Sequence, residues 1–295
     1  MIKSTSLADH SGFTEICRAL DISDTAITQI QTVKRLQTLD SALEKDSLIY
    51  VESKEAIKAL EIHQSVSVLV KDKVPSDYQI AAITVKNPSF VFWSLYEFIE
   101  RSKNFVSPSI ISNKSIIGNN TSISKQGVVI EDDVTVDDNV VIKPGVIIRK
   151  GAKIGPGSVI GSNGLEVKQT LFGRIVISHK GGVVISENVE IGALCTINQG
   201  LGDKATQICA DTKIDSSVHI AHSCLIGKRN TIAANVTFGG NVVTGSDVFF
   251  GLNSTIKNSI KIGNNVFVGM AAVVVKDVEV GVVAGNPARV LRANQ

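Results

Sequence analysis

The chain has 295 residues, with 30 basic and 28 acidic side chains, a formal charge of +2 and a pI near 8.3. Because these charges are scattered and form no basic block, the composition does not favour nucleic-acid binding. The N-terminus lacks the apolar core of a signal peptide and no run is long enough for a membrane-spanning helix, so we expect a cytoplasmic protein.

The first third, residues 1–107, is predicted to be a small α/β domain. Helical spacing of apolar residues occurs in SKEAIKALEIH (53–63) and SFVFWSLYEFIERSK (89–103). Short strand-like runs, SLIYV (47–51) and SVSVLV (65–70), lie between and before them. The isolated cysteines, Cys17, Cys195, Cys209 and Cys224, form no C-x-x-C pair, which argues against a zinc ribbon and favours reduced thiols.

The remainder of the chain repeats every six residues. Aliphatic or aromatic residues recur at six-residue steps from Ile208 to Val274, where Thr244 is the single exception, and earlier from Ile130 to Ile160 and from Ile185 to Ile197. This period fits short strands separated by turns, each strand sending one side chain into a shared core. We therefore predict a parallel β-solenoid over residues 108–281, with flanking loops at 161–184 and 198–207 and a C-terminal tail at 282–295.

With these repeats the sequence resembles the hexapeptide-repeat acyltransferases, and in particular the lipid A family of UDP-3-O-acylglucosamine N-acyltransferases. The matching segments are LDSALEKDSLIYVESKE, VKNPSFVF, VIGSNGLEV, GGVVISENVEIGALCTINQG and KIDSSVHIAHSCLIG. The resemblance implies a mainly β protein with a left-handed parallel β-helix and an N-terminal nucleotide-binding-like domain. It also implies a homotrimer with sites between subunits.

The resemblance assigns the general base to His222 in the segment VHIAHSCLIG. An imidazole is suited to take a proton from an amine near neutral pH. A donor to the oxyanion is also needed, and the family uses the amide one coil later, which falls on Gly240; this glycine is alternatively one required by a turn. Asp215 matches an acidic position that supports the base, or is a solvated turn residue. As a nucleophile, Cys224 is less expected than as a small buried residue.

The acceptor site is expected to differ from that of the lipid A family. Tyr50 matches the first of two aromatics that clamp the uracil, whereas Ser53 replaces an asparagine and Ala56 the second aromatic. Losing one stack weakens base binding by about 1–3 kcal/mol, so the nucleotide is left open as UDP, dTDP or another. The resemblance places Asn163 and Gly164 beside the acceptor. His219 is expected at the surface or a subunit interface, and we include it among the substrate-contacting candidates.

The C-terminal segment MAAVVVKDVEVGVVAGNPARVLRANQ resembles coenzyme A-dependent nucleotide-sugar N-acetyltransferases instead of ending in the helix that meets acyl carrier protein. In that family the GNPARV loop closes the last coil beside the pantetheine, and basic side chains can meet the phosphates. The candidates for coenzyme A binding are Lys257, Lys276, Gly285, Asn286, Pro287 and Arg289, with Arg292 further along.

Taken together, the sequence predicts an N-acyltransferase that moves a short acyl group, foremost acetyl, from coenzyme A to the amine of a nucleotide-linked amino sugar for a surface glycan. We expect acetyl-CoA or another acyl-CoA as cosubstrate, no permanently bound cofactor and no metal. The first alternative is a lipid A N-acyltransferase that uses acyl carrier protein. The second is a non-catalytic solenoid that binds nucleotide sugars or serves as a scaffold.

Overall fold

The computed structural model describes residues 12–37, 46–52, 66–74 and 81–292. The chain forms two compact units: residues 1–104 with 165–178, and residues 105–164 with 179–295. The first of the two helices predicted in the N-terminal third, at 53–63, lies outside the described residues, as do Ser53 and Ala56. The domain boundaries at 107 and 281 stay predictions.

The first unit is the expected α/β fold. Its four strands form a parallel sheet in the order β1-β2-β3-β4. The strands are β1 (Arg35–Leu36), β2 (Ser47–Tyr50), β3 (Val66–Val70) and β4 (Ala81–Thr84), and the helices are α1 (Phe13–Ala19), α2 (Asp24–Gln31) and α4 (Pro88–Ser102). α4 begins where the sequence provides a cap and a proline, because Asn87 Oδ1 accepts the N–H of Phe90 at 3.0 Å and Pro88 occupies the first turn.

Part of the predicted flanking loop 161–184 is an antiparallel hairpin, β14 (Val167–Thr170) and β15 (Gly173–Val176), and it belongs to the first unit. The N–H of Leu171 donates to Ser94 Oγ on α4 at 2.8 Å, and the N–H of Ser178 donates to Glu97 Oε2 at 2.9 Å. Glu97 is 2 % exposed, and its carboxylate accepts hydrogen bonds from the Ser178 N–H, from Ser178 Oγ and from Arg101 Nε, without which its burial would be costly.

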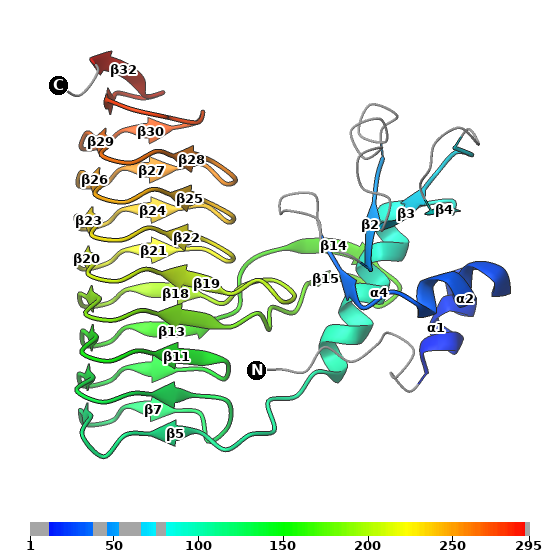
Figure 1. Ribbon diagram of the computed structural model, residues 1–295, viewed down its shortest axis with the longest axis horizontal. Helices are drawn as coiled ribbons and strands as arrows, with labels where there is room; N and C mark the ends of the chain where they lie inside the picture. Colours follow the sequence, from blue (N-terminus) through cyan, green and yellow to red (C-terminus); the bar gives the residue numbers. More distant parts are fainter. Residues whose placement is uncertain (1–11, 38–45, 53–65, 75–80, 293–295) are drawn as a thin grey trace. The chain divides into compact units, whose positions relative to one another are not determined.

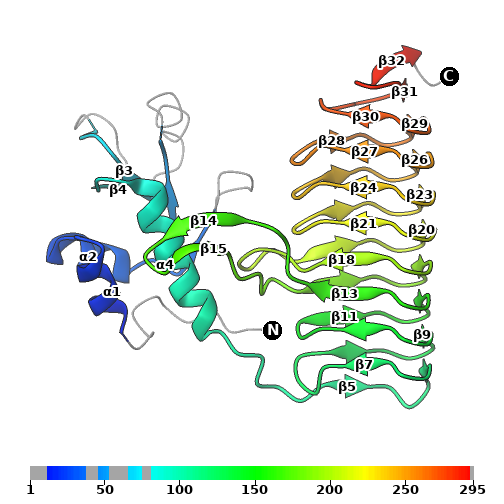
Figure 2. The ribbon, with the colours of Figure 1, turned by 180° about the vertical axis from the view of Figure 1, so that it is seen from behind.

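The second unit is a left-handed parallel β-helix, as predicted, and its stacked coils are seen in Figures 1 and 2. Each coil contributes one short strand to each of three sheets, which we call the β5, β6 and β7 sheets. The β5 sheet holds β5 (Ile110–Ile111), β8 (Val129–Ile130), β11 (Val146–Ile148), β16 (Val183–Ile185), β19 (Thr206–Ile208), β22 (Leu225–Ile226), β25 (Val243–Thr244) and β28 (Lys261–Ile262). The β6 sheet holds β6 (Ile116–Ile117), β9 (Thr135–Val136), β12 (Lys153–Ile154), β17 (Glu190–Ile191), β20 (Lys213–Ile214), β23 (Thr231–Ile232), β26 (Phe249–Phe250), β29 (Phe267–Val268), β31 (Val282–Ala284) and β32 (Arg289–Arg292). The β7 sheet holds β7 (Ser122–Ile123), β10 (Val141–Ile142), β13 (Val159–Ser162), β18 (Thr196–Asn198), β21 (His219–Ile220), β24 (Thr237–Phe238), β27 (Thr255–Ile256) and β30 (Val273–Val274).

The core of this unit is the six-residue series itself. Ile220 pairs in register with Phe238, and Phe238 with Ile256, so like positions stack from coil to coil. Phe238 and Phe250 are fully buried and meet edge to face with ring centroids 4.9 Å apart. The turns explain the Asn, Asp and Gly that punctuate the sequence: Asn139, Asn235 and Asn253, among others, have φ near +60°, a conformation that asparagine tolerates better than most residues.

The last coil is covered by an antiparallel hairpin, in which β31 pairs with β32 (red in Figure 1). The loop between them is tied to β30, because Val273 N–H donates to Gly285 O at 3.0 Å and Ala288 N–H donates to Val273 O at 2.8 Å. A cover of this kind is what a solenoid end needs. Among the helices of the described ranges, none has the length and hydropathy to cross a membrane.

Candidate active site

The candidate base His222 lies in the turn that links β21 of the β7 sheet to β22 of the β5 sheet. We call this edge of the β-helix the His222 corner. Because one coil takes 18 residues here, Gly240, Asn258 and Lys276 follow His222 along the same corner in successive coils. Both insertions in the repeat also leave the coil at this corner, between β13 and β16 and between β18 and β19. The corner therefore gathers the irregular segments, where ligand sites are common.

His222 and Gly240 are in close contact. A Cβ placed on Gly240 would lie 2.5 Å from His222 Nε2 and 2.6 Å from Cε1. The two turns are fixed to each other, since Asn241 N–H donates to His222 O at 2.9 Å. A side chain at position 240 would therefore displace the His222 ring, and glycine leaves the ring in this place. Among the described residues, the Gly240 N–H has no acceptor, whereas its neighbour Gly239 donates to Ile256 O.

The first insertion brings Gly164 and a second histidine to His222. A Cβ on Gly164 would lie 3.0 Å from both His179 Nε2 and His222 Cδ2. The His179 and His222 ring centroids are 5.0 Å apart, with the ring planes inclined by 56°. Asn163 holds the segments together, because its Oδ1 accepts the His179 N–H at 2.7 Å. Sequence reasoning missed His179; the signal available was its place in SHKGG, just before the repeat resumes.

The second insertion, between β18 and β19, is fastened to the turn of His222. Ser223 N–H donates to Thr206 Oγ1 at 2.8 Å, and Leu201 N–H donates to Ser223 Oγ at 3.0 Å. From the same loop, Lys204 Nζ donates to Asn241 Oδ1 at 3.3 Å, which places one ammonium group next to Gly240.

Two predicted residues lie away from this corner. Asp215 follows β20, in the turn between the β6 and β7 sheets, and its Oδ1 accepts the N–H of Ser216 at 2.7 Å. Within one chain β21 separates it from His222, so the two side chains belong to different edges. His219 points outward from β21, is half-buried, and is paired in register with Thr196 and Thr237. Burial lowers the pKa of His219 below its ordinary value of 6.5.

The predicted donor-binding residues occupy the C-terminal coils. Lys276 is exposed on the His222 corner. Lys257 is exposed in the turn after β27, in the coil that lies between the coils of Gly240 and Lys276. Gly285, Asn286 and Pro287 form the exposed loop of the terminal hairpin, next to β30. Arg289 is exposed and donates to Ala288 O at 3.0 Å. Within the described residues, no three metal-binding side chains come together.

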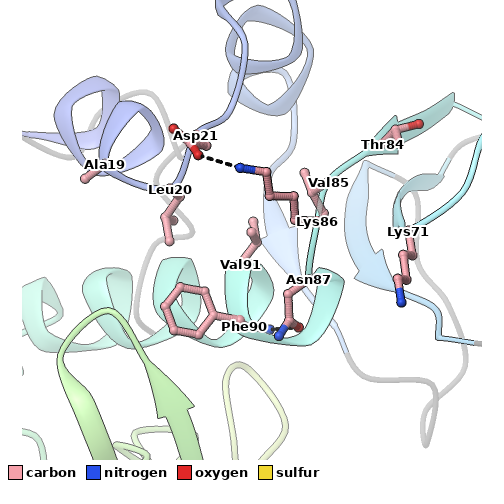
Figure 3. A pocket seen from close by; sticks show the side chains of 10 residues that line it. All are labelled: Ala19, Leu20, Asp21, Lys71, Thr84, Val85, Lys86, Asn87, Phe90 and Val91. Carbon is pink, nitrogen blue, oxygen red and sulfur yellow. Dashed lines mark hydrogen bonds and ion pairs between the residues drawn. The ribbon is translucent and has the colours of Figure 1, made fainter.

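The first unit contains Tyr50 and a separate pocket. The Tyr50 ring is half-buried, with its centroid 4.9 Å from that of Phe92 on α4. The pocket, of about 430 Å³, lies at the carboxyl ends of β3 and β4 and is lined by Lys71, Lys86 and Asn87 among others (Figure 3). Lys86 forms an ion pair with Asp21 at 3.2 Å. Lys86 and Asn87 belong to the segment VKNPSFVF, for which the sequence predicted no binding role.

Comparisons with known proteins match the repeat. The family model described as bacterial transferase hexapeptide (six repeats) matches residues 127–162 and 205–240. The model of the hexapeptide repeat of succinyl-transferase matches residues 108–144 and 241–276. The chain is therefore a hexapeptide-repeat protein with a left-handed β-helix, and its predicted resemblance to the hexapeptide-repeat acyltransferases is confirmed.

Individual proteins similar to this chain are acyltransferases of UDP-linked glucosamines. UDP-3-O-acylglucosamine N-acyltransferase of Wolinella succinogenes is 40% identical over 26% of this chain and 24% of its own length. The protein of that name from Helicobacter pylori is 37% identical over 30% of this chain and 26% of its own length. A crystal structure of a UDP-N-acetylglucosamine acyltransferase has a TM-score of 0.50 and 27% identity, covering 63% of this chain and 72% of that one. The chain thus spans about a quarter of the length of these curated relatives.

Proposed function

We propose that the protein is an N-acyltransferase that moves acetyl or another short acyl group from coenzyme A to the amine of a nucleotide-linked amino sugar. The observation that carries this proposal is the contact between His222 Nε2 and the backbone of Gly240, at the corner where both insertions leave the coil. The names of the relatives, which are acyltransferases of UDP-linked glucosamines, support the reaction class and the acceptor class. The product would enter a surface glycan.

In the proposed reaction His222 takes a proton from the attacking amine. The amine nitrogen forms a bond to the thioester carbonyl carbon, and the carbonyl oxygen becomes an oxyanion. The N–H of Gly240, which has no acceptor among the described residues, would donate to that oxygen. When the carbon–sulfur bond breaks, the thiolate leaves and the imidazolium of His222 returns the proton to it. An amide and a free thiol result, and no bond to the enzyme forms.

Coenzyme A is the proposed donor because basic side chains continue along the His222 corner toward the terminal hairpin. Lys276 lies two coils beyond Gly240 on that corner, and the loop Gly285–Pro287 is bound to β30 just before it. Ammonium groups at this end can pair with the phosphates of the nucleotide half, while the thioester reaches back to Gly240. Such donors place the reaction in the cytoplasm.

A second candidate is the lipid A reaction, with a hydroxyacyl group delivered by acyl carrier protein. The observation that favours it is the name of the similar proteins from Wolinella succinogenes and Helicobacter pylori, UDP-3-O-acylglucosamine N-acyltransferase. The two candidates share the base, the oxyanion donor and the amine acceptor. They differ in the donor, and that difference is directly testable.

We also propose that the protein is a homotrimer with active sites between subunits, as is usual for this fold. Asp215 and His222 lie at different edges of one chain, so Asp215 could support the base only from a neighbouring copy. Tyr50 and Ser53 keep their proposed contact with the nucleotide, and Asn163, Gly164 and His219 theirs with the acceptor.

The test is a thiol-release assay with acetyl-CoA and a panel of UDP- and dTDP-linked amino sugars, using wild type and His222→Ala. Turnover that is lost in the variant would support the coenzyme A reaction and the base together. Turnover only with hydroxyacyl carrier protein would replace it with the second candidate. Transfer that persists in His222→Ala would displace the base, and no transfer with either donor would favour a binding or scaffold role.

A further inference from the structure

His179 is a buried imidazole that the proposed reaction does not yet use. It is 1 % exposed, whereas His222 is only partly buried. An imidazole with so little surface cannot be the group that meets the acceptor amine. Burying a polar imidazole costs free energy, whereas burying an aliphatic side chain of similar size does not. A histidine at this buried position therefore indicates a functional role.

The backbone around His179 is held from two sides. Its N–H donates to Asn163 Oδ1 at 2.7 Å, and Asn163 Nδ2 donates to Gly164 O at 3.1 Å. The neighbouring Ser162 Oγ donates to Asn198 Oδ1 at 2.7 Å, which joins the start of the first insertion to the start of the second. The outgoing and returning limbs of the first insertion are thus fixed side by side. Together, these hydrogen bonds hold the His179 ring at a defined place against His222.

The two rings are in direct contact, with centroids 5.0 Å apart and planes inclined by 56°. That separation leaves no room for water between them. Gly164 completes the enclosure, because a Cβ there would approach both rings to 3.0 Å. On its other side His222 Nε2 faces Gly240. His222 is therefore bounded by Gly240 on the Nε2 side and by Gly164 and His179 elsewhere.

A base must present one particular nitrogen to its substrate, and a third group usually fixes its orientation and tautomer. In many sites this group is a carboxylate, but within one chain Asp215 lies at another corner. The geometry points to His179 as the positioning residue of His222: it holds the base so that Nε2 stays directed at Gly240. This inference rests on the proposed function, since it assigns the base to His222.

The test uses three variants of the full chain. His179→Leu keeps the buried volume and removes the polar ring, and His179→Gln restores a polar side chain. Thr212→Val is the matched control, because Thr212 is also fully buried and hydrogen-bonded, with its Oγ1 donating to Gly227 O at 2.8 Å, but it lies in the turn between the β5 and β6 sheets. Each variant is assayed for kcat, for KM and for thermal stability.

We expect His179→Leu to lower kcat by about 10–100-fold with KM unchanged for donor and acceptor, and His179→Gln to recover most of the loss. Thr212→Val should lose stability without losing kcat. The second readout needs no turnover: in selectively labelled protein, the ¹⁵N shifts of the His222 ring at fixed pH should change in His179→Leu, because the ring contact that holds His222 in place is lost.

The inference would be overturned by His222 ring signals that are identical in wild type and His179→Leu, by a wild-type kcat in that variant, or by a His179→Gln enzyme as impaired as the leucine variant. If the proposed function itself is wrong, the experiment gives another result. Wild type would then transfer no acyl group, while the ring signals would still report whether His179 positions His222.

Discussion

His222 Nε2 and the backbone of Gly240 are so close that the smallest side chain at position 240 would fall 2.5 Å from the nitrogen. This contact joins two turns that are 18 residues apart in sequence and adjacent on one corner of the β-helix. It also places the Gly240 N–H next to the nitrogen that would carry the proton.

Gly240→Ala should therefore reduce transfer strongly while leaving the fold intact. The new methyl group must displace the imidazole, and a displacement of about 1 Å at a reacting group can cost about 100-fold in rate. The measurement is kcat/KM together with the melting temperature. Gly269→Ala is the control, because it makes the same exchange at a different corner, where the methyl group would meet Ala284 Cβ at 3.1 Å. Equal activity in both variants would contradict the close contact.

Thr244→Val should destabilise the protein although valine restores the apolar series. Thr244 is buried, and its Oγ1 accepts from Asn230 Nδ2 at 2.8 Å and from Gly227 N–H at 2.9 Å. Valine would leave both donors without this acceptor, at a cost of about 1–3 kcal/mol. Urea unfolding gives the free energy of unfolding. Thr244→Ser keeps the oxygen and should lose far less; a valine variant as stable as wild type would refute the role assigned to these hydrogen bonds.

The repeat was predictable from the sequence because each six-residue unit is one short strand followed by one turn. Such a unit depends only on the local spacing of apolar residues and on turn residues such as Asn139 and Asn235. The exception at Thr244 could be seen but not explained, since its partner Asn230 lies 14 residues earlier, in a turn of the preceding coil. Asp215 comes only seven residues before His222, which suggests proximity, yet one strand of a solenoid carries the chain to the next corner.

The proximity of His222 and Gly240 could be predicted from the sequence, because they are 18 residues, or one coil of the repeat, apart. His179 could not, because it reaches His222 through the long insertion and not through the repeat. The hairpin β14–β15 was missed for a similar reason: its partner is α4, and Ser94 of α4 precedes Leu171 of the hairpin by 77 residues. Local periodicity therefore predicts the scaffold, while contacts that close long loops decide the details of the site.

Neighbouring residues Phe249 and Phe250 should differ sharply in their contribution to stability. Phe250 is fully buried against Phe238, whereas Phe249 is 37 % exposed and stacks on Phe267 with centroids 4.8 Å apart. We expect Phe250→Ala to cost about 3–5 kcal/mol and Phe249→Ala about 0.5–1.5 kcal/mol. Urea unfolding of both variants measures this difference. Similar losses would mean that the alternation of inward and outward side chains is wrong at β26.

His219 should make the folded state less stable below neutral pH. Burial lowers its pKa in the folded protein below the ordinary 6.5, so the unfolded chain takes up a proton first as the pH falls. The stability that the folded protein gains from keeping His219 neutral is fully present above pH 6.5. It is lost as the pH falls from 6.5 through the lowered pKa of His219. His219→Thr, which repeats its register partners Thr196 and Thr237, should flatten the melting temperature between pH 7.5 and about pH 5. Parallel curves for variant and wild type would contradict the lowered pKa.

The thiols should be mostly inert in the folded protein, which matters for any thiol-release assay. Cys17, Cys195 and Cys224 are buried, and burial raises the pKa of Cys17 and of Cys224 to about 12. At pH 8 a thiol with such a pKa is ionised in only about one molecule in 10,000. We expect dithionitrobenzoate to react slowly with Cys209, which is half-buried, and with all four cysteines only after denaturation. Cys224→Ala should leave native labelling unchanged, because Cys224 Sγ faces inward and donates to Gly239 O at 3.2 Å. Rapid labelling that disappears in this variant would instead place a reactive thiol two residues from the base.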